Sequence, residues 1–297
     1  MSITLKKFNP KTIRDNSICV FIAKRGSGKS TCVKDIMCHK KYLPVGIVCS
    51  GTEDGNGFYK NFIPDSLIYN EFRLDAIESV VNSQRLLVNQ GKKSPAFIIL
   101  DDCMYDKKFL RETVIRQIFY NGRHWNMFFL LTMQYVMDLT PDLRSNIDYV
   151  FVFRENILQN REKIYKQFFG IFPTFDMFNQ VMNKCTENYE CLVLDNTSKS
   201  NKIEDCVFWY KARNMDNVQF RICHPDVWRK HNNKYNPKHD EKQFETIKKR
   251  LESKKKDNVV NPKKPVYMVE KKEQEKTKGP MDSCKDFHSK QVSRYSI

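Results

Sequence analysis

A glycine-rich turn is the first feature of this sequence that could do chemistry. It consists of Ala23, Lys24, Arg25, Gly26, Ser27, Gly28, Lys29, Ser30 and Thr31. Glycines let the backbone curl so that several N–H groups point inward, and a helix that begins at the turn adds unpaired N–H donors. Such a cradle binds phosphate. We expect Lys29 to reach the β- and γ-phosphates of a bound nucleotide and the Ser30 hydroxyl to ligate Mg²⁺.

The flanking residues predict the elements that hold this turn. The apolar run 18–22 predicts a buried strand, and apolar residues at helical spacing predict a helix over 30–40. The usual phosphate-binding pattern starts with glycine where this chain has Ala23, a departure of a single methyl group. A chance glycine-rich turn is the alternative, and the Gly-Ser-Gly-Lys-Ser-Thr order directly behind an apolar strand argues against it.

Two carboxylates follow another apolar run, residues 96–100. A buried parallel strand that ends in an acid puts that acid at the mouth of the sheet, beside the phosphate-binding turn. Asp101 can then hold Mg²⁺, as the Walker-B acid does in P-loop NTPases, and Asp102 can orient or deprotonate the attacking water. The alternatives are a solvated loop acid at either position and a helix N-cap at Asp102.

Polar residues also follow two later apolar runs. Gln134 comes just after the predicted strand 127–132, and its amide could bond the γ-phosphate or the attacking water. A glutamine satisfied within its own loop is the alternative. Arg154 follows the predicted strand 147–153, where an arginine can reach the nucleotide of a neighbouring subunit, although most surface arginines do not.

The remaining periodicity fits an α/β fold with a mostly parallel sheet flanked by helices. Further strands are predicted at 45–49, 68–72 and, as a hairpin, 189–194 with 206–210; further helices are predicted at 74–90, 107–122 and 157–184, the last one split near Gly170 and Pro173. We divide the chain into an N-terminal extension (1–17), an ATPase domain (18–227) and a basic tail (228–297).

The charge is strongly basic. The 297 residues carry a formal net charge of +16, and the tail alone has 20 basic and 10 acidic residues. Such an excess favours a polyanionic partner, with nucleic acid first and an anionic membrane surface second. The tail has little apolar periodicity and is expected to be largely disordered, either as a solvating segment or as a contact to nucleic-acid phosphates.

The apolar segments and the cysteines indicate where the protein is located and whether its thiols are reduced. No signal peptide is recognisable, and no stretch approaches about 18 consecutive apolar residues, so we expect a soluble intracellular protein without a membrane span. Several of the ten cysteines lie inside apolar runs and are expected to be reduced core residues. A zinc site is the alternative, but Cys185, Cys191, Cys206 and Cys223 match no ligand spacing.

Four segments together carry a resemblance to a known family: 23–31, 98–102, 131–134 and 144–148. In their order and spacing the chain resembles the genome-packaging ATPases of large double-stranded DNA viruses, a viral branch of the FtsK/HerA class. The resemblance covers about residues 15–225. It implies an additional-strand P-loop ATPase that assembles into a ring, a hexamer or a pentamer, and drives double-stranded DNA into a preformed capsid.

The same resemblance implies roles for individual residues. Lys29 and Ser30 match the Walker-A positions, Asp101 matches the Walker-B acid, and Asp102 stands where this class usually has glutamate. At the next motifs, Gln134 matches the polar sensor, Arg144 matches the finger that acts in trans, and Arg123 is the second candidate for that finger.

Partners and location also follow from the resemblance. It implies capsid or portal-vertex proteins as partners and the viral factory in the host-cell cytoplasm as the location, with association with the virion as an alternative. Two other functions stay open: a P-loop ATPase that acts as a helicase or recombination factor without packaging, and a basic nucleic-acid-binding protein with a vestigial nucleotide site.

Overall fold

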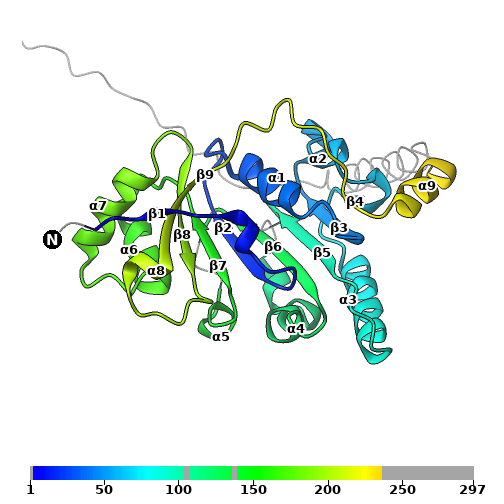
Figure 1. The fold of residues 1–297 in the computed structure, drawn as a ribbon, viewed down its shortest axis with the longest axis horizontal. Coiled ribbons are helices and arrows are strands. Elements are labelled where there is room, and N and C mark those ends of the chain that lie inside the picture. Colours follow the sequence, from blue (N-terminus) through cyan, green and yellow to red (C-terminus); the bar gives the residue numbers. More distant parts are fainter. Residues whose placement is uncertain (1–2, 104–106, 136–138, 236–297) are drawn as a thin grey trace, which may run out of the picture. The chain divides into compact units, whose positions relative to one another are not determined.

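A nine-stranded sheet forms the centre of the part of the chain that the computed structural model describes, residues 3–103, 107–135 and 139–235 (Figure 1). Its strands lie in the order β1-β9-β8-β7-β2-β6-β5-β3-β4. They are β1 (Lys6–Lys7), β2 (Ile18–Ile22), β3 (Val45–Ser50), β4 (Ile68–Tyr69), β5 (Ala96–Asp101), β6 (Met127–Met133), β7 (Tyr149–Val152), β8 (Glu190–Asp195) and β9 (Val207–Lys211).

Most strand pairs are parallel. Every neighbouring pair from β4 across to β7 is parallel, as is the pair of β1 with β9, whereas β8 pairs antiparallel with both β7 and β9. The predicted hairpin is therefore present as β8 and β9. Since the central strands run in one direction, the residues that follow β2, β3, β5 and β6 lie together at the C-terminal ends of these strands.

Helices cover both faces of the sheet. The α-helices are α1 (Lys29–His39), α2 (Glu53–Asn56), α3 (Leu74–Asn89), α4 (Thr113–Asn121), α5 (Pro141–Arg144), α6 (Leu158–Phe168), α7 (Phe175–Cys185), α8 (Ile203–Cys206) and α9 (Pro225–Lys234). Short 3₁₀ turns are η1 (Pro10–Thr12), η2 (Tyr59–Asn61), η3 (Asp65–Leu67) and η4 (Lys107–Arg111). The α/β fold class, with a mostly parallel sheet flanked by helices, is confirmed.

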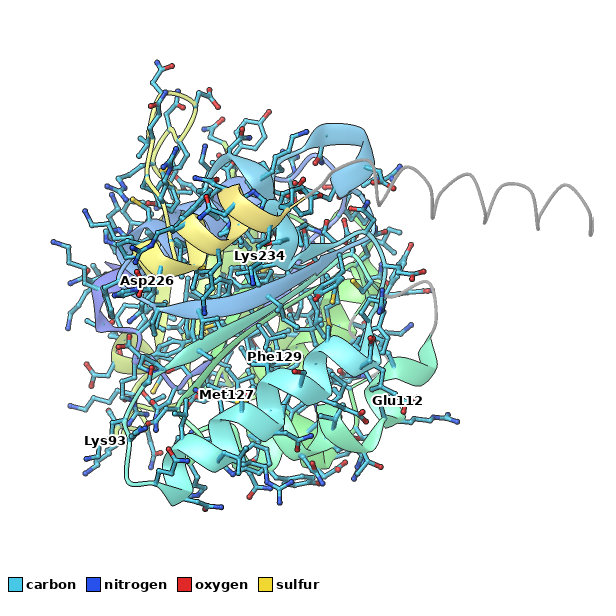
Figure 2. The ribbon with its side chains drawn as sticks, turned by 90° about the vertical axis from the view of Figure 1, so that its right-hand side faces the viewer. Lys93, Glu112, Met127, Phe129, Asp226 and Lys234 are labelled. Carbon is cyan, nitrogen blue, oxygen red and sulfur yellow. The ribbon has the colours of Figure 1, made fainter. Side chains whose placement is uncertain are left out.

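Two apolar cores lie on the two faces. One contains buried side chains of α3, α4, α6 and α7, and the other contains those of α1 and η2 with α9 packed against it. Alternate residues of a strand face opposite sides of a sheet, so each central strand serves both cores. Figure 2 shows Met127 and Phe129 of β6 on the side of α3, while α9, which runs from Pro225 to Lys234, covers the other side.

Three predicted elements differ in extent. The predicted helix 107–122 is interrupted at Glu112, whose backbone is extended (ψ 133°), so the chain forms η4 and then α4. Apolar spacing did not distinguish these two turns because buried residues lie on both sides of the break. The strand predicted at 68–72 is limited to β4, and the one at 147–153 to β7.

The two ends of the predicted ATPase domain continue into regular structure. Before it, β1 forms the edge of the sheet, and Phe8 and Ile13 are buried. After it, α9 spans the boundary that we predict at 227, and the rest of the predicted tail, residues 236–297, lies outside the described residues. Within the described residues, no helix combines the length and the apolar character needed to cross a bilayer.

Candidate nucleotide site

The turn that follows β2 has the backbone of a phosphate cradle. Gly26 (φ +73°) and Gly28 (φ +90°) take left-handed conformations that favour glycine. Gly28 is the N-cap of α1 and provides no side-chain cap, so the first N–H groups of the helix stay available to a ligand. Ala23 is buried and is not among the residues with positive φ, so its methyl group causes no backbone strain.

A cavity of about 700 Å³ opens over this turn. The segment that follows β3 forms its opposite wall. Its lining consists of Lys24, Arg25, Gly26, Gly28, Lys29, Ser30, Thr31, Gly51, Thr52, Gly55, Asn56 and Asp102. The cavity is large enough for a nucleoside triphosphate, and its wall is rich in N–H donors and cationic side chains.

Lys29 contacts both predicted acids. Its Nζ lies 3.4 Å from Asp101 Oδ1 and forms a hydrogen-bonded ion pair with Asp102 Oδ1. Lys29 and Asp101 are buried, whereas the Asp102 side chain is 18% exposed at the cavity. Asp102 has φ +51°, a conformation that Asp and Asn adopt more readily than most residues. The structure thus brings the cradle and the two acids together.

Both oxygens of Asp101 are held by buried hydroxyl groups. Thr132 Oγ1 donates to Oδ1 at 2.6 Å, and Tyr59 OH donates to Oδ2 at 2.9 Å. Thr132 also accepts from the backbone N–H of Asp102 at 3.0 Å, so one hydroxyl fixes both acids. With Ser30 nearby in the cradle, these are hard oxygen donors of the kind that suits Mg²⁺.

Tyr59 was not found by sequence reasoning. It lies in η2, where the buried carboxylate of Glu53 accepts from the N–H groups of Tyr59 at 2.9 Å and Lys60 at 3.0 Å. Burial raises the pKa of Tyr59 and the Asp101 carboxylate raises it further, so the hydroxyl remains a proton donor. Nothing in the local sequence links residue 59 to residue 101. By contrast, Thr132 is a polar residue in an otherwise apolar strand, a signal that could have been used.

We expect Tyr59→Phe to raise the Mg²⁺ concentration that half-saturates ATP hydrolysis, because Asp101 loses the group that orients its second oxygen. The variant should also lose about 1–3 kcal/mol of folding stability, since that oxygen is left without a donor. Mg²⁺ titrations and urea unfolding measure the two effects.

Tyr210→Phe is the matched control. It removes another hydroxyl that donates to a buried carboxylate, that of Asp35 (2.5 Å), but outside the residues that line the cavity. This control should lose stability without changing the Mg²⁺ dependence. The same shift in both variants would contradict a positioning role for Tyr59.

Gln134 does not line the cavity over the cradle. It lies just beyond β6 in a separate small pocket that it shares with Tyr135, Glu155 and Asn160. The structure therefore does not bring this amide into contact with Lys29, Asp101 or Asp102.

The cradle is tied to the segment after β7 by an ion pair. Lys24 Nζ lies 2.5 Å from Glu155 Oε1, and Glu155 is buried. Burial raises the pKa of Glu155, but the hydrogen bonds from Lys24, the Ile157 N–H and Asn160 outweigh it, so this pKa lies below its usual value. Glu155 therefore stays ionised and holds the first turn of the cradle in place.

The two candidate arginine fingers lie at the N-terminal ends of the strands, whereas the cradle lies at the C-terminal ends. Arg123 precedes β6, and its guanidinium pairs at 2.5 Å with the buried Asp148, which also accepts from the Ile18 N–H. Arg144 ends α5 before β7 and donates to the Leu139 carbonyl at 2.7 Å. Neither lines the cavity over the cradle. Within one chain, both are separated from the nucleotide site by the length of the strands.

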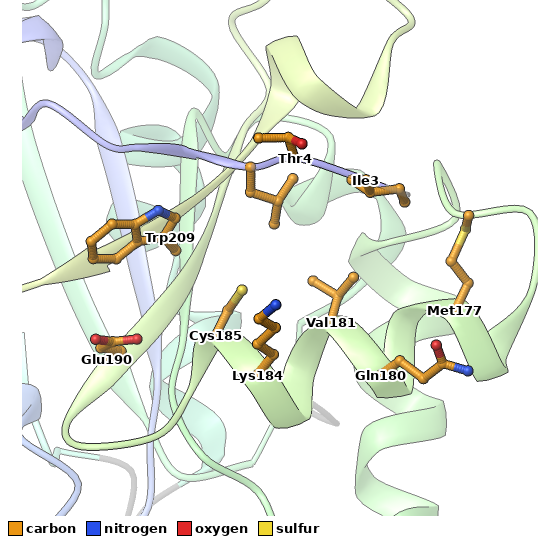
Figure 3. A pocket seen from close by; sticks show the side chains of 10 residues that line it. Ile3, Thr4, Met177, Gln180, Val181, Lys184, Cys185, Glu190 and Trp209 are labelled. Atoms are coloured by element: carbon orange, nitrogen blue, oxygen red, sulfur yellow. The ribbon is translucent and has the colours of Figure 1, made fainter. Parts of the chain in front are cut away.

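A second cavity, of about 560 Å³, shares no lining residue with the first. It lies between the N-terminal segment, α7 and the strands β8 and β9. Figure 3 shows Val181 and Lys184 of α7 facing Ile3 and Thr4, with Trp209 beside them. Apolar and charged groups are mixed in its wall, and none belongs to the predicted site.

Comparisons with known proteins give this geometry a context. An uncharacterized protein of Acanthamoeba polyphaga mimivirus is 36% identical over 247 residues, which is 80% of this chain and 86% of the relative. An uncharacterized protein of Invertebrate iridescent virus 3 is 37% identical over 224 residues, 72% of this chain and 86% of the relative. The AAA-like domain family matches residues 80–212.

The chain belongs to the same protein family as these relatives from large DNA viruses, and it contains a domain of the AAA-like, FtsK/HerA type. A solved structure is similar to this fold. The genome packaging NTPase B204 from Sulfolobus turreted icosahedral virus 2, in complex with AMP, matches with a TM-score of 0.50. The match covers 68% of this chain and 100% of B204 at 17% identity. The chain therefore has the α/β fold of P-loop NTPases.

Proposed function

We propose that this protein is an ATP-driven motor that moves double-stranded viral DNA into preformed capsids during virion assembly. The observation that carries the proposal is the convergence of Lys29, Asp101 and Asp102 beneath the cavity over the cradle. The viral relatives and the fold shared with a genome packaging NTPase support it. We infer that it works in the viral factory of the host cell.

The proposed hydrolysis cycle uses the residues in turn. Lys29 leaves Asp102 when the triphosphate enters and pairs with the β- and γ-phosphate oxygens. Ser30 and Asp101 would hold Mg²⁺, which supplies charge neutralisation at the phosphates when bound. The carboxylate of Asp102, released from its ion pair, accepts a hydrogen bond from the water that attacks the γ-phosphate. Gln134 is proposed as the sensor of that phosphate, through a movement of the segment after β6.

ATP turnover with and without duplex DNA tests the motor. We expect hydrolysis to rise several-fold with duplex DNA at low salt and to lose this stimulation as salt increases, because phosphate contacts by basic residues are screened. Equal turnover with and without DNA would argue against a motor. A monomer that unwinds forked DNA would instead support the helicase alternative.

A ring would complete the site with an arginine from the next subunit. Arg144 lies at the N-terminal ends of the strands, away from the cradle, so it would act on the nucleotide of a neighbouring subunit. Capsid or portal-vertex proteins are the proposed partners of the ring. Arg123 is the less favoured candidate because its guanidinium already neutralises the buried Asp148.

We expect Arg144→Ala to lower ATP turnover about 10³-fold, the lower end of the effect of an arginine finger. A complementation assay tests action in trans: subunits with Arg144→Ala are mixed with subunits with Lys29→Ala. The mixture should regain turnover, since each Lys29→Ala subunit supplies an arginine to an intact cradle. Arg229→Ala, which removes an exposed arginine of α9, is the control and should change little. A mixture as inactive as its components would contradict the trans role.

A further inference from the structure

Tyr189 has an unusual backbone conformation and an exposed ring. It is the residue before β8, and it is 68% exposed. Both Asn188 (φ +49°) and Tyr189 (φ +65°) are left-handed. Asn tolerates this region, but a bulky residue such as Tyr rarely occupies it. Strained backbone conformations of this kind are concentrated at ligand-binding and active sites.

The Tyr189 side chain lies against the cradle. A Cβ atom at Gly28 would come within 3.3 Å of both Cβ and Cδ1 of Tyr189. The ring therefore borders the cradle at Gly28, outside the residues that line the main cavity. The side chain is largely exposed, so one face of the ring is open to a ligand.

The strand order gives the direction in which a bound nucleotide would extend. The acids that must face the γ-phosphate follow β5, which lies two places from β2 on one side, with β6 between them. On the other side β7 and then β8 follow. A triphosphate held at Gly28 and Lys29 with its γ end toward the acids would extend its nucleoside half toward β8, where Tyr189 lies.

We propose that the Tyr189 ring is the platform on which the base of the nucleotide stacks, an inference that rests on the proposed ATP site. None of the residues that line the main cavity is aromatic. A base stacked on an aromatic ring gains affinity without base-specific hydrogen bonds. The chemical class of ligand is therefore a nucleoside triphosphate bound at its base by stacking and at its phosphates by the cradle.

Tyr189→Asn removes the ring and keeps a residue that tolerates the left-handed backbone. In equilibrium binding with EDTA present, we expect this variant to bind ATP about 5- to 100-fold more weakly than the wild type. Binding of inorganic tripolyphosphate, which has no base, should be unchanged. Tyr189→Phe should bind ATP within about twofold of the wild type, since it retains the stacking face.

Tyr42→Asn is the matched control, because this tyrosine is 59% exposed but follows the C-terminal end of α1 and does not line the cavity. It should bind ATP as the wild type does. A Tyr189→Asn variant that keeps wild-type ATP affinity, or that loses tripolyphosphate affinity equally, overturns the platform while the ATP site stands. A wild type that binds neither ligand overturns the proposed ATP site and the platform with it.

A direct readout uses Tyr189→Trp. Stacking should quench the fluorescence of the new indole on addition of ATP but not of tripolyphosphate. Asn56→Trp places an indole on the opposite wall of the cavity, and its fluorescence would be quenched if the base extended toward that wall instead. Quenching at position 56 and not at position 189 would refute the platform.

Discussion

Lys29→Ala should lower ATP turnover by at least about 10²–10³-fold, the cost of removing one charged group that stabilises a transition state. Its ammonium is the buried cation that contacts both Asp101 and Asp102, and it is the group that would meet the β- and γ-phosphates. Steady-state turnover over a wide range of ATP concentrations measures the loss. A variant that retains wild-type turnover would remove the basis for the ATPase proposal.

The same substitution should also destabilise the nucleotide-free protein, by about 3 kcal/mol, because it leaves two neighbouring carboxylates without their cation. Asp101 keeps its donors from Thr132 and Tyr59, so the folded state should survive. The double variant Lys29→Met with Asp102→Asn separates the two effects. It removes one of the repelling charges and should regain stability in urea unfolding without regaining turnover.

Asp102→Asn should lower kcat about 10²–10⁴-fold, the usual contribution of a general base, while ATP binds at least as tightly as in the wild type. In the nucleotide-free protein this carboxylate competes with phosphate for Lys29, so its neutralisation frees the lysine and removes a like charge from the site. Asn also fits the left-handed backbone at this position, so the variant should fold normally. Single-turnover kinetics and equilibrium ATP binding measure the two opposite changes.

Asp54→Asn is the control for this substitution, since it neutralises an exposed acid of α2 that does not line the cavity. Its kcat should be unchanged. A normal kcat in Asp102→Asn would show that another group accepts the proton of the attacking water. Asp102→Glu tests whether the longer side chain of the wider class works in this site.

Sequence patterns correctly predicted those parts of the site in which an apolar strand and reactive residue types follow one another within a few residues. The strand 18–22, the cradle with Lys29, and the acids at the end of an apolar run were all predicted at the observed positions. Each depends on short-range rules: buried parallel strands are continuously apolar, and glycines at fixed offsets form the turn. The mostly parallel sheet follows from the same alternation of strands and helices.

Several features of the site depended on the tertiary structure. Tyr59 and Thr132 reach Asp101 from 42 and 31 residues away, and Arg123 is bound to Asp148. Tyr189 borders Gly28 although β7 lies between the strands that they adjoin, β8 and β2. Hydrogen bonds and ring contacts depend on which strands are neighbours, and strand order is set by the packing of the whole sheet. The sequence by itself thus determined the groups that would act on a phosphate. Only the tertiary structure decided which side chains hold those groups, because their distances are properties of the assembled sheet and not of the local chain.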